Sequence, residues 1–73
     1  MGIEMAMRIH RLSAQPCERY PWNYRMDFGD TELGILWGDI QPWAQRLEVP
    51  GVWVGSTFYT NKQGMSIVAL RWA

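Results

Sequence analysis

Residues 22–28 read WNYRMDF, and this segment has the clearest secondary-structure pattern in the chain. Aromatic or large apolar side chains occupy every second position, and Asn, Arg and Asp lie between them. Successive side chains of a β-strand point to opposite faces of its sheet. The segment therefore predicts a strand with one buried face and one solvent-exposed face.

The segments on either side of this strand extend the β pattern. Residues 5–12 alternate apolar and polar side chains, which predicts a first strand. Residues 13–21 contain two prolines, which donate no backbone hydrogen bond, so we expect a loop there. A Gly-Asp turn over 28–31 then leads to 32–37, where a second alternation predicts a third strand and a hairpin.

The residues after Gly38 predict one short helix that ends at Pro50 and Gly51. Asp39 can cap its N-terminus, and Pro42 lies in its first turn, where the missing donor costs little. One apolar stripe follows at the spacing i, i+3, i+4 and i+7, formed by Ile40, Trp43, Ala44 and Leu47.

A second hairpin is predicted after the helix. Two β-rich segments, 52–60 and 65–72, flank Asn61–Gly64, which has hairpin length and a glycine where a positive φ is needed. If the valines of 52–60 face the core, Trp53 and Tyr59 stand on the outer face of the sheet.

The predicted fold class is mainly β, in the order β-β-β-α-β-β with one short helix. It is either a small five-stranded antiparallel barrel or a strongly curled sheet. This is the element order of the OB barrel, and an SH3-like barrel fits nearly as well; both are analogies of element order alone. Closure would hide the strand edges. We expect residues 1–73 to form a single domain, and residues 1–4 could form a disordered tail.

The charges sum to zero but are unevenly distributed along the chain. Residues 1–25 hold four arginines and two glutamates, whereas residues 26–48 hold five acidic side chains and one arginine. Residues 49–73 carry only Lys62 and Arg71. Such segregation can steer a partner, or it can be an ordinary solvated exterior. A neutral chain is a poor generic binder of nucleic acid.

The sequence holds few groups suited to chemistry. Cys17 and His10 form the one conceivable nucleophile and base pair, and nothing in the sequence around them prepares a nucleophile. A structural zinc site needs four ligands, so we expect no metal. With so few reactive groups, we also expect no cofactor and no enzymatic activity. A single cysteine favours a reducing, cytoplasmic location, and no apolar run is long enough to span a membrane.

Three acidic side chains, Asp27, Asp30 and Glu32, lie close together in the sequence. Their spacing distantly resembles a calcium-binding loop but lacks the remaining ligands and the closing glutamate. We therefore expect an acidic patch on a solvated turn.

Ten aromatic side chains are more than a core of 73 residues is expected to hide. We expect the surplus rings on the last hairpin to form a partner-binding surface with basic side chains, and its members are Trp53, Tyr59, Arg71, Trp72, Arg8 and Arg11. Exposed aromatic rings beside arginines are typical of protein-binding hot spots and of stacking platforms for single strands. The other interpretation is that the rings close a small barrel.

The sequence thus predicts a non-enzymatic protein-binding domain. Its size suggests a phage-type regulator or inhibitor that docks on a larger host complex, such as RNA polymerase or a defence nuclease. The alternative is an OB-like or SH3-like module that binds nucleic acid through the same aromatics. A homodimer is left open, and no membrane is expected.

Overall fold

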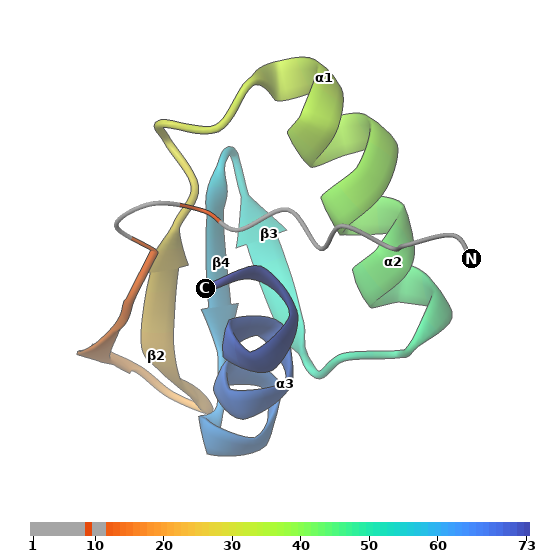
Figure 1. Ribbon diagram of the computed structural model, residues 1–73. Coiled ribbons are helices and arrows are strands. Elements are labelled where there is room, and N and C mark those ends of the chain that lie inside the picture. Colours follow the sequence, from red (N-terminus) through yellow and green to blue (C-terminus); the bar gives the residue numbers. More distant parts are fainter. Residues whose placement is uncertain (1–8, 10–11) are drawn as a thin grey trace.

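The computed structural model describes residue 9 and residues 12–73, and shows a sheet packed against helices (Figure 1). Its elements are, in order, β1 (Ala14–Arg19), β2 (Trp22–Asp27), α1 (Leu33–Ile35), the π-helical turn η1 (Leu36–Ile40), α2 (Gln41–Arg46), β3 (Gly51–Val54), β4 (Thr57–Thr60) and α3 (Lys62–Trp72). The four strands form one antiparallel sheet in the order β1-β2-β4-β3. The sheet is open, with β1 and β3 at its edges.

The strand predicted at 22–28 is confirmed as β2 over its first six residues. It pairs with the central strand β4, where Met26 lies opposite Phe58 and Tyr24 lies opposite Thr60. The exposed fractions of the Met26 and Phe58 side chains are 0% and 1%. The alternation of apolar and polar residues predicted this strand correctly because the strand buries only one face.

The predicted loop at 13–21 is wrong, because it contains β1. Pro16 is tolerated there because an edge strand can leave one side of its backbone unpaired. The pairing register shifts between Pro16 and Arg19, which marks a bulge or irregularity. The strand predicted at 5–12 lies outside the described residues except for Ile9 and Leu12, and neither of these is in a strand.

The third strand predicted at 32–37 is also wrong, because α1, η1 and α2 follow one another as a helical segment. Leu36 and Ile40 are buried and lie four residues apart, which places them on one helix face. Leu33 and Trp37, predicted to share a strand face, are 64% and 49% exposed. Leu47, predicted to continue the apolar stripe, is 56% exposed.

The π-helical turn lies directly before Pro42. A proline inside a helix lacks the N–H donor and clashes with the carbonyl group four residues earlier. At this point the backbone N–H of Gln41 donates to the carbonyl of Leu36, five residues back, so the helix is locally widened. The wide turn lets the helix continue past Pro42, whereas the sequence predicts a helix start there.

The second predicted hairpin turns at a different place. Its chain reverses at Gly55 and Ser56, between β3 and β4, and not at Asn61–Gly64. Gly55 has a φ of 62°, the backbone angle that the first central residue of a type II′ turn requires.

The predicted last strand, 65–72, is wrong because these residues belong to α3. The side-chain Oδ1 of Asn61 accepts a hydrogen bond of 2.8 Å from the N–H of Gly64, so Asn61 caps the helix. Buried positions recur every four residues at Gly64, Val68 and Trp72. This periodicity explains why both faces of the supposed strand look apolar in the sequence.

Both helical segments pack on one face of the sheet, which we call the inner face. Figure 1 shows α3 lying in front of β4. One buried cluster joins both helical segments to the strands, and its members are Leu12, Met26, Phe28, Leu36, Ile40, Phe58, Val68 and Trp72. The rings of Trp43 and Trp72 meet edge to face at 5.5 Å between centroids and connect the two helical segments. The fold is thus a four-stranded open sheet with a helical layer, and the fifth strand of the predicted barrel is replaced by α3.

The close approach of α3 to β4 generates a prediction about Gly64. A Cβ atom at this position would meet the Oγ1 of Thr60 and would lie 2.6 Å from the carbonyl oxygen of Pro50. The Thr60 hydroxyl is buried and donates to that same carbonyl at 2.5 Å. We expect Gly64→Ala to lower the free energy of unfolding, measured in urea, by about 1 to 3 kcal/mol.

Gly34→Ala is the matched control, because nothing lies within 4 Å of a Cβ built at Gly34. This helical position should gain about 0.5 to 1 kcal/mol from the better helix propensity of alanine. Equal effects of the two substitutions would contradict the packing of α3 on β4.

The cap of α3 generates a second prediction. Asn61→Ala removes the acceptor for the Gly64 N–H and should cost about 1 kcal/mol, whereas Asn61→Asp keeps an acceptor and should cost less. Thermal unfolding followed by circular dichroism compares the two variants. Identical losses in both would argue against a helix start at Asn61.

Candidate functional site

The outer face of the sheet, opposite the helices, has Tyr59 of β4 near its middle. Tyr59 lies opposite Arg25 on β2 and opposite Val52 on β3. Side chains of directly opposed residues project to the same face, so these three are neighbours. Val52 and Val54 are 37% and 48% exposed.

Arg19 contacts the Tyr59 ring, and Arg25 is the cross-strand neighbour of Tyr59 on β2. The guanidinium carbon of Arg19 lies 4.5 Å from the ring centroid, within the range of a cation–π interaction. Arg25 donates from Nη2 to the Oε1 of Gln15 at 2.9 Å. We call the set Arg19, Arg25, Val52, Val54 and Tyr59 the outer patch.

Trp53 does not belong to this patch, so its predicted placement on the outer face is wrong. Trp53 lies opposite Phe58, and both rings point to the inner face. The ring centroids of Trp53 and Phe58 are 4.7 Å apart, and those of Trp53 and Phe28 are 5.3 Å apart. The turn at Gly55 and Ser56 causes this placement, because it sets position 53 opposite position 58.

The other predicted partner-binding residues do not gather on the outer face. Trp72 is 3% exposed and lies in the core, so its predicted exposure on a hairpin surface is wrong. Arg71 is on α3, and its guanidinium carbon lies 4.3 Å from the centroid of the Trp72 ring. Arg8 and Arg11 lie outside the described residues. Of the predicted set, the structure places Tyr59 on the outer face.

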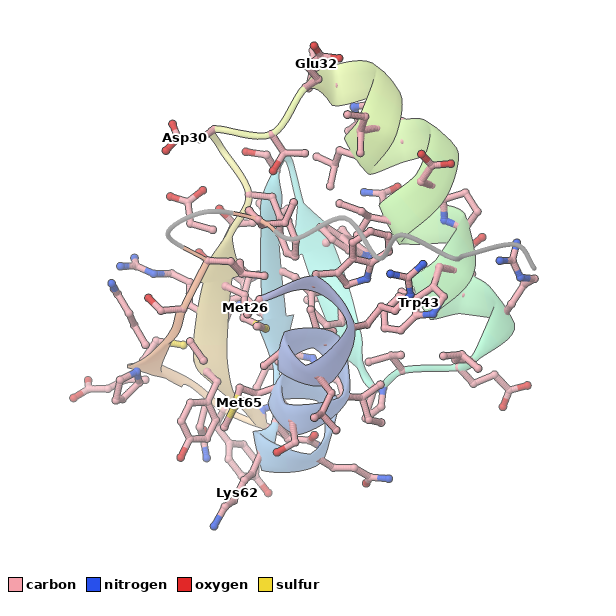
Figure 2. The ribbon with its side chains drawn as sticks, viewed as in Figure 1. Met26, Asp30, Glu32, Trp43, Lys62 and Met65 are labelled. Carbon is pink, nitrogen blue, oxygen red and sulfur yellow. The ribbon has the colours of Figure 1, made fainter. Side chains whose placement is uncertain are left out.

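The three predicted acidic residues are all exposed, and Glu32 lies apart from the other two. Asp27 and Asp30 line a hollow of about 210 Å³ together with Gln15 and Gly29. The Oδ1 of Asp27 accepts a 2.8 Å hydrogen bond from the N–H of Gly29. Glu32 lies at the start of α1, and Figure 2 shows the side chains of Asp30 and Glu32 pointing away from the body of the protein. Over residues 9 and 12–73, no three His, Cys, Asp or Glu side chains form a group that could hold a metal ion.

Cys17, the candidate nucleophile, lies half-buried in β1. Its Sγ donates to the backbone carbonyl of Trp22 at 3.4 Å. His10, its predicted base, lies outside the described residues. In the part of the chain that the structure describes, no helix is long and apolar enough to cross a membrane.

A second hollow, of about 410 Å³, lies between the end of α2 and the edge strand β3. We call it the edge hollow, and its lining residues are Ala44, Gln45, Glu48, Val49, Gly51, Val52, Trp53 and Phe58. The residue pattern does not predict this hollow, because the hollow depends on the position of the hairpin turn at Gly55 and Ser56. The run of residues 49–61 without a charged side chain is the signal that could have indicated it.

Comparison with known protein families, curated proteins and solved structures finds no significant match to this chain.

The different surroundings of Trp53 and Tyr59 generate a third prediction. Trp53→Ala removes a ring that packs on Phe28 and Phe58, and should lower the free energy of unfolding by roughly 3 kcal/mol. Tyr59→Ala removes a ring from the outer face and should cost about 1 kcal/mol or less. Urea unfolding measures both, and a loss for Tyr59→Ala as large as that for Trp53→Ala would contradict the assignment of faces.

Proposed function

We propose that this chain is a non-enzymatic protein-binding domain that docks through the outer patch on an acidic, partly apolar surface of a larger protein. The observation that carries this proposal is the Tyr59 ring, which lies beside two arginines and exposed valines on a sheet face that no described helix covers.

The composition of the outer patch supports a protein partner. Tyrosine and arginine are enriched among residues that dominate protein–protein binding energy. Arginine also pairs with carboxylates through two parallel hydrogen bonds, which favours an acidic partner surface. Val52 and Val54 add exposed apolar area next to these polar groups.

The contacts within the outer patch also support docking. Arg19 stacks on Tyr59, and Arg25 is hydrogen-bonded to Gln15, so both long side chains are partly ordered before any partner arrives. Side chains that are already ordered lose less conformational entropy on binding. From the small size of the chain, we further propose that this partner is a host complex such as RNA polymerase or a defence nuclease, with this chain as its regulator or inhibitor.

Binding of single-stranded nucleic acid is the second candidate, and the Arg19–Tyr59 stack is the observation that favours it. Bases stack on aromatic rings of open sheets, and arginines contact phosphates. A groove for a nucleic-acid strand, however, needs several cations, and the outer patch contains two. Asp27 lies two residues after Arg25 on β2, and so on the same face of the sheet.

A fourth prediction tests the proposed function. We expect the tagged chain to retain one partner from cells that express it, and we expect Arg25→Glu and Tyr59→Ala to lose that partner. Binding of the purified partner, measured by calorimetry, should weaken roughly 30-fold for each variant, the effect of losing a hot-spot residue. Unfolding midpoints should stay close to that of the unchanged chain.

Arg46→Glu is the matched control, because Arg46 is an exposed arginine in the last turn of α2 and should not affect binding. Equal loss of binding in this control would contradict docking through the outer patch. Binding of a labelled oligothymidylate tests the second candidate function. Tight binding that weakens steeply with added salt and is lost in Tyr59→Ala would favour nucleic acid over a protein as the partner.

A further inference from the structure

The two edges of the sheet differ in how they resist pairing with another strand. Edge strands with free backbone groups pair with other chains unless prolines, bulges or charges prevent it. β1 has all three devices, because it contains Pro16, a register shift, and the charged Glu18 and Arg19. This edge is therefore unsuited to pairing.

The β3 edge has none of these devices within the strand. Its four residues pair with β4 in an unbroken register from Gly51 to Val54. Residues 49–61 contain no charged side chain, so nothing in this segment repels an approaching apolar strand. The edge hollow leaves room beside Gly51, Val52 and Trp53, and the exposed Glu48 is the charged side chain in its lining.

The alternation of backbone hydrogen bonds along the strands shows which backbone groups of β3 point away from β4. The N–H of Phe28 donates to the carbonyl of Ser56 at 2.8 Å, on the β2 side of the hairpin. Backbone groups along an antiparallel strand alternate between its two neighbours, so those of Thr57 and Tyr59 face β3. Their partners Val54 and Val52 are thereby paired. The N–H and C=O of Gly51 and Trp53 then point to the edge of the sheet that no described strand occupies.

The sequence of this edge is a palindrome, GVWVG over residues 51–55. An antiparallel copy of the same strand, centred on Trp53, meets it with equivalent residues in every position. We propose that β3 pairs with β3 of a second copy of this chain, around a two-fold axis, to form one continuous eight-stranded sheet.

The side chains and backbone fit this arrangement. The outward N–H and C=O of Trp53 exchange two hydrogen bonds with those of Trp53 in the second copy. Val52 lies opposite Val54 of the second copy on the outer face, so the two exposed valines cover each other. The hairpin tip of the second copy, which consists of the small residues Gly55 and Ser56, enters the edge hollow beside Gly51.

The size of the contact sets its strength. A four-residue strand exchanges few hydrogen bonds, and stable interfaces bury about 1,200 to 2,000 Å². This contact is smaller, so the dimer dissociates on dilution, with a dissociation constant on the order of 0.1 mM.

Sedimentation equilibrium of the pure 73-residue chain over a wide concentration range tests the proposal. The unchanged chain should shift from monomer to dimer. The double variants V52K/V54K and V52E/V54E should each stay monomeric, because like charges then face each other across the two-fold axis. Their mixture should associate again, because each lysine then faces a glutamate.

Leu70→Lys is the control, because Leu70 is 82% exposed on α3 and away from the β3 edge. It should leave the dimer unchanged. Circular dichroism shows whether each variant is folded. If the double variants do not fold, hydrogen exchange of the unchanged chain still tests the dimer. The Trp53 N–H should exchange more slowly as the protein concentration rises.

Three results would overturn the proposal: a monomer up to about 1 mM, no association in the mixture of folded Lys and Glu variants, or a Trp53 amide whose exchange does not depend on concentration. Dimerisation needs no partner protein, so Tyr59→Ala and Arg25→Glu should dimerise normally. Failure of the dimer and failure of docking are therefore separate results.

Discussion

The contact on which the rest of the structure depends is the packing of Phe58 between its neighbours on the inner face. Phe58 lies on the central strand β4, opposite Met26 on one side and Trp53 on the other. Its side chain is 1% exposed, and the Trp53 ring lies tilted against it. Because these three side chains project to one face, that face is the apolar one, and both helical segments must pack there.

Among residues 12–73, the helical segments cover one face of this sheet. The helices supply Leu36, Ile40, Val68 and Trp72 to the common core, and the opposite face has no described helix against it. An open antiparallel sheet commonly has one packed face and one wet face. The availability of the outer patch thus follows from the choice of inner face, and that choice follows from the Phe58 contacts.

The sequence predicted those parts of the fold in which only one periodicity is present. Residues 22–27 alternate strictly, and their strand, their buried side and their wet side were predicted correctly. Residues 32–37 are ambiguous, because Leu33, Ile35 and Trp37 alternate while Leu36 and Ile40 have helical spacing. Helical spacing won because it buries Leu36 and Ile40 together against the sheet.

The candidate site was harder to predict because it depends on the position of one turn. Asn61–Gly64 and Gly55–Ser56 both have turn chemistry, and asparagine is favoured in turns and at helix caps alike. Moving the reversal from Asn61–Gly64 to Gly55–Ser56 changes which residue lies opposite Phe58. That change moved Trp53 from the outer face to the core, while Tyr59 kept its predicted face.

The same turn connects the two proposed surfaces. It makes β3 a short edge strand with uncharged residues on both sides, and it places Val52 between Tyr59 and the free edge. Pairing of two β3 strands around a two-fold axis perpendicular to the sheet keeps both outer faces on the same side. A dimer therefore presents two outer patches to one partner surface, and a second contact that follows the first is effectively intramolecular. If one partner surface bound both patches, it would also hold the two copies together, so the proposed edge contact need not be strong.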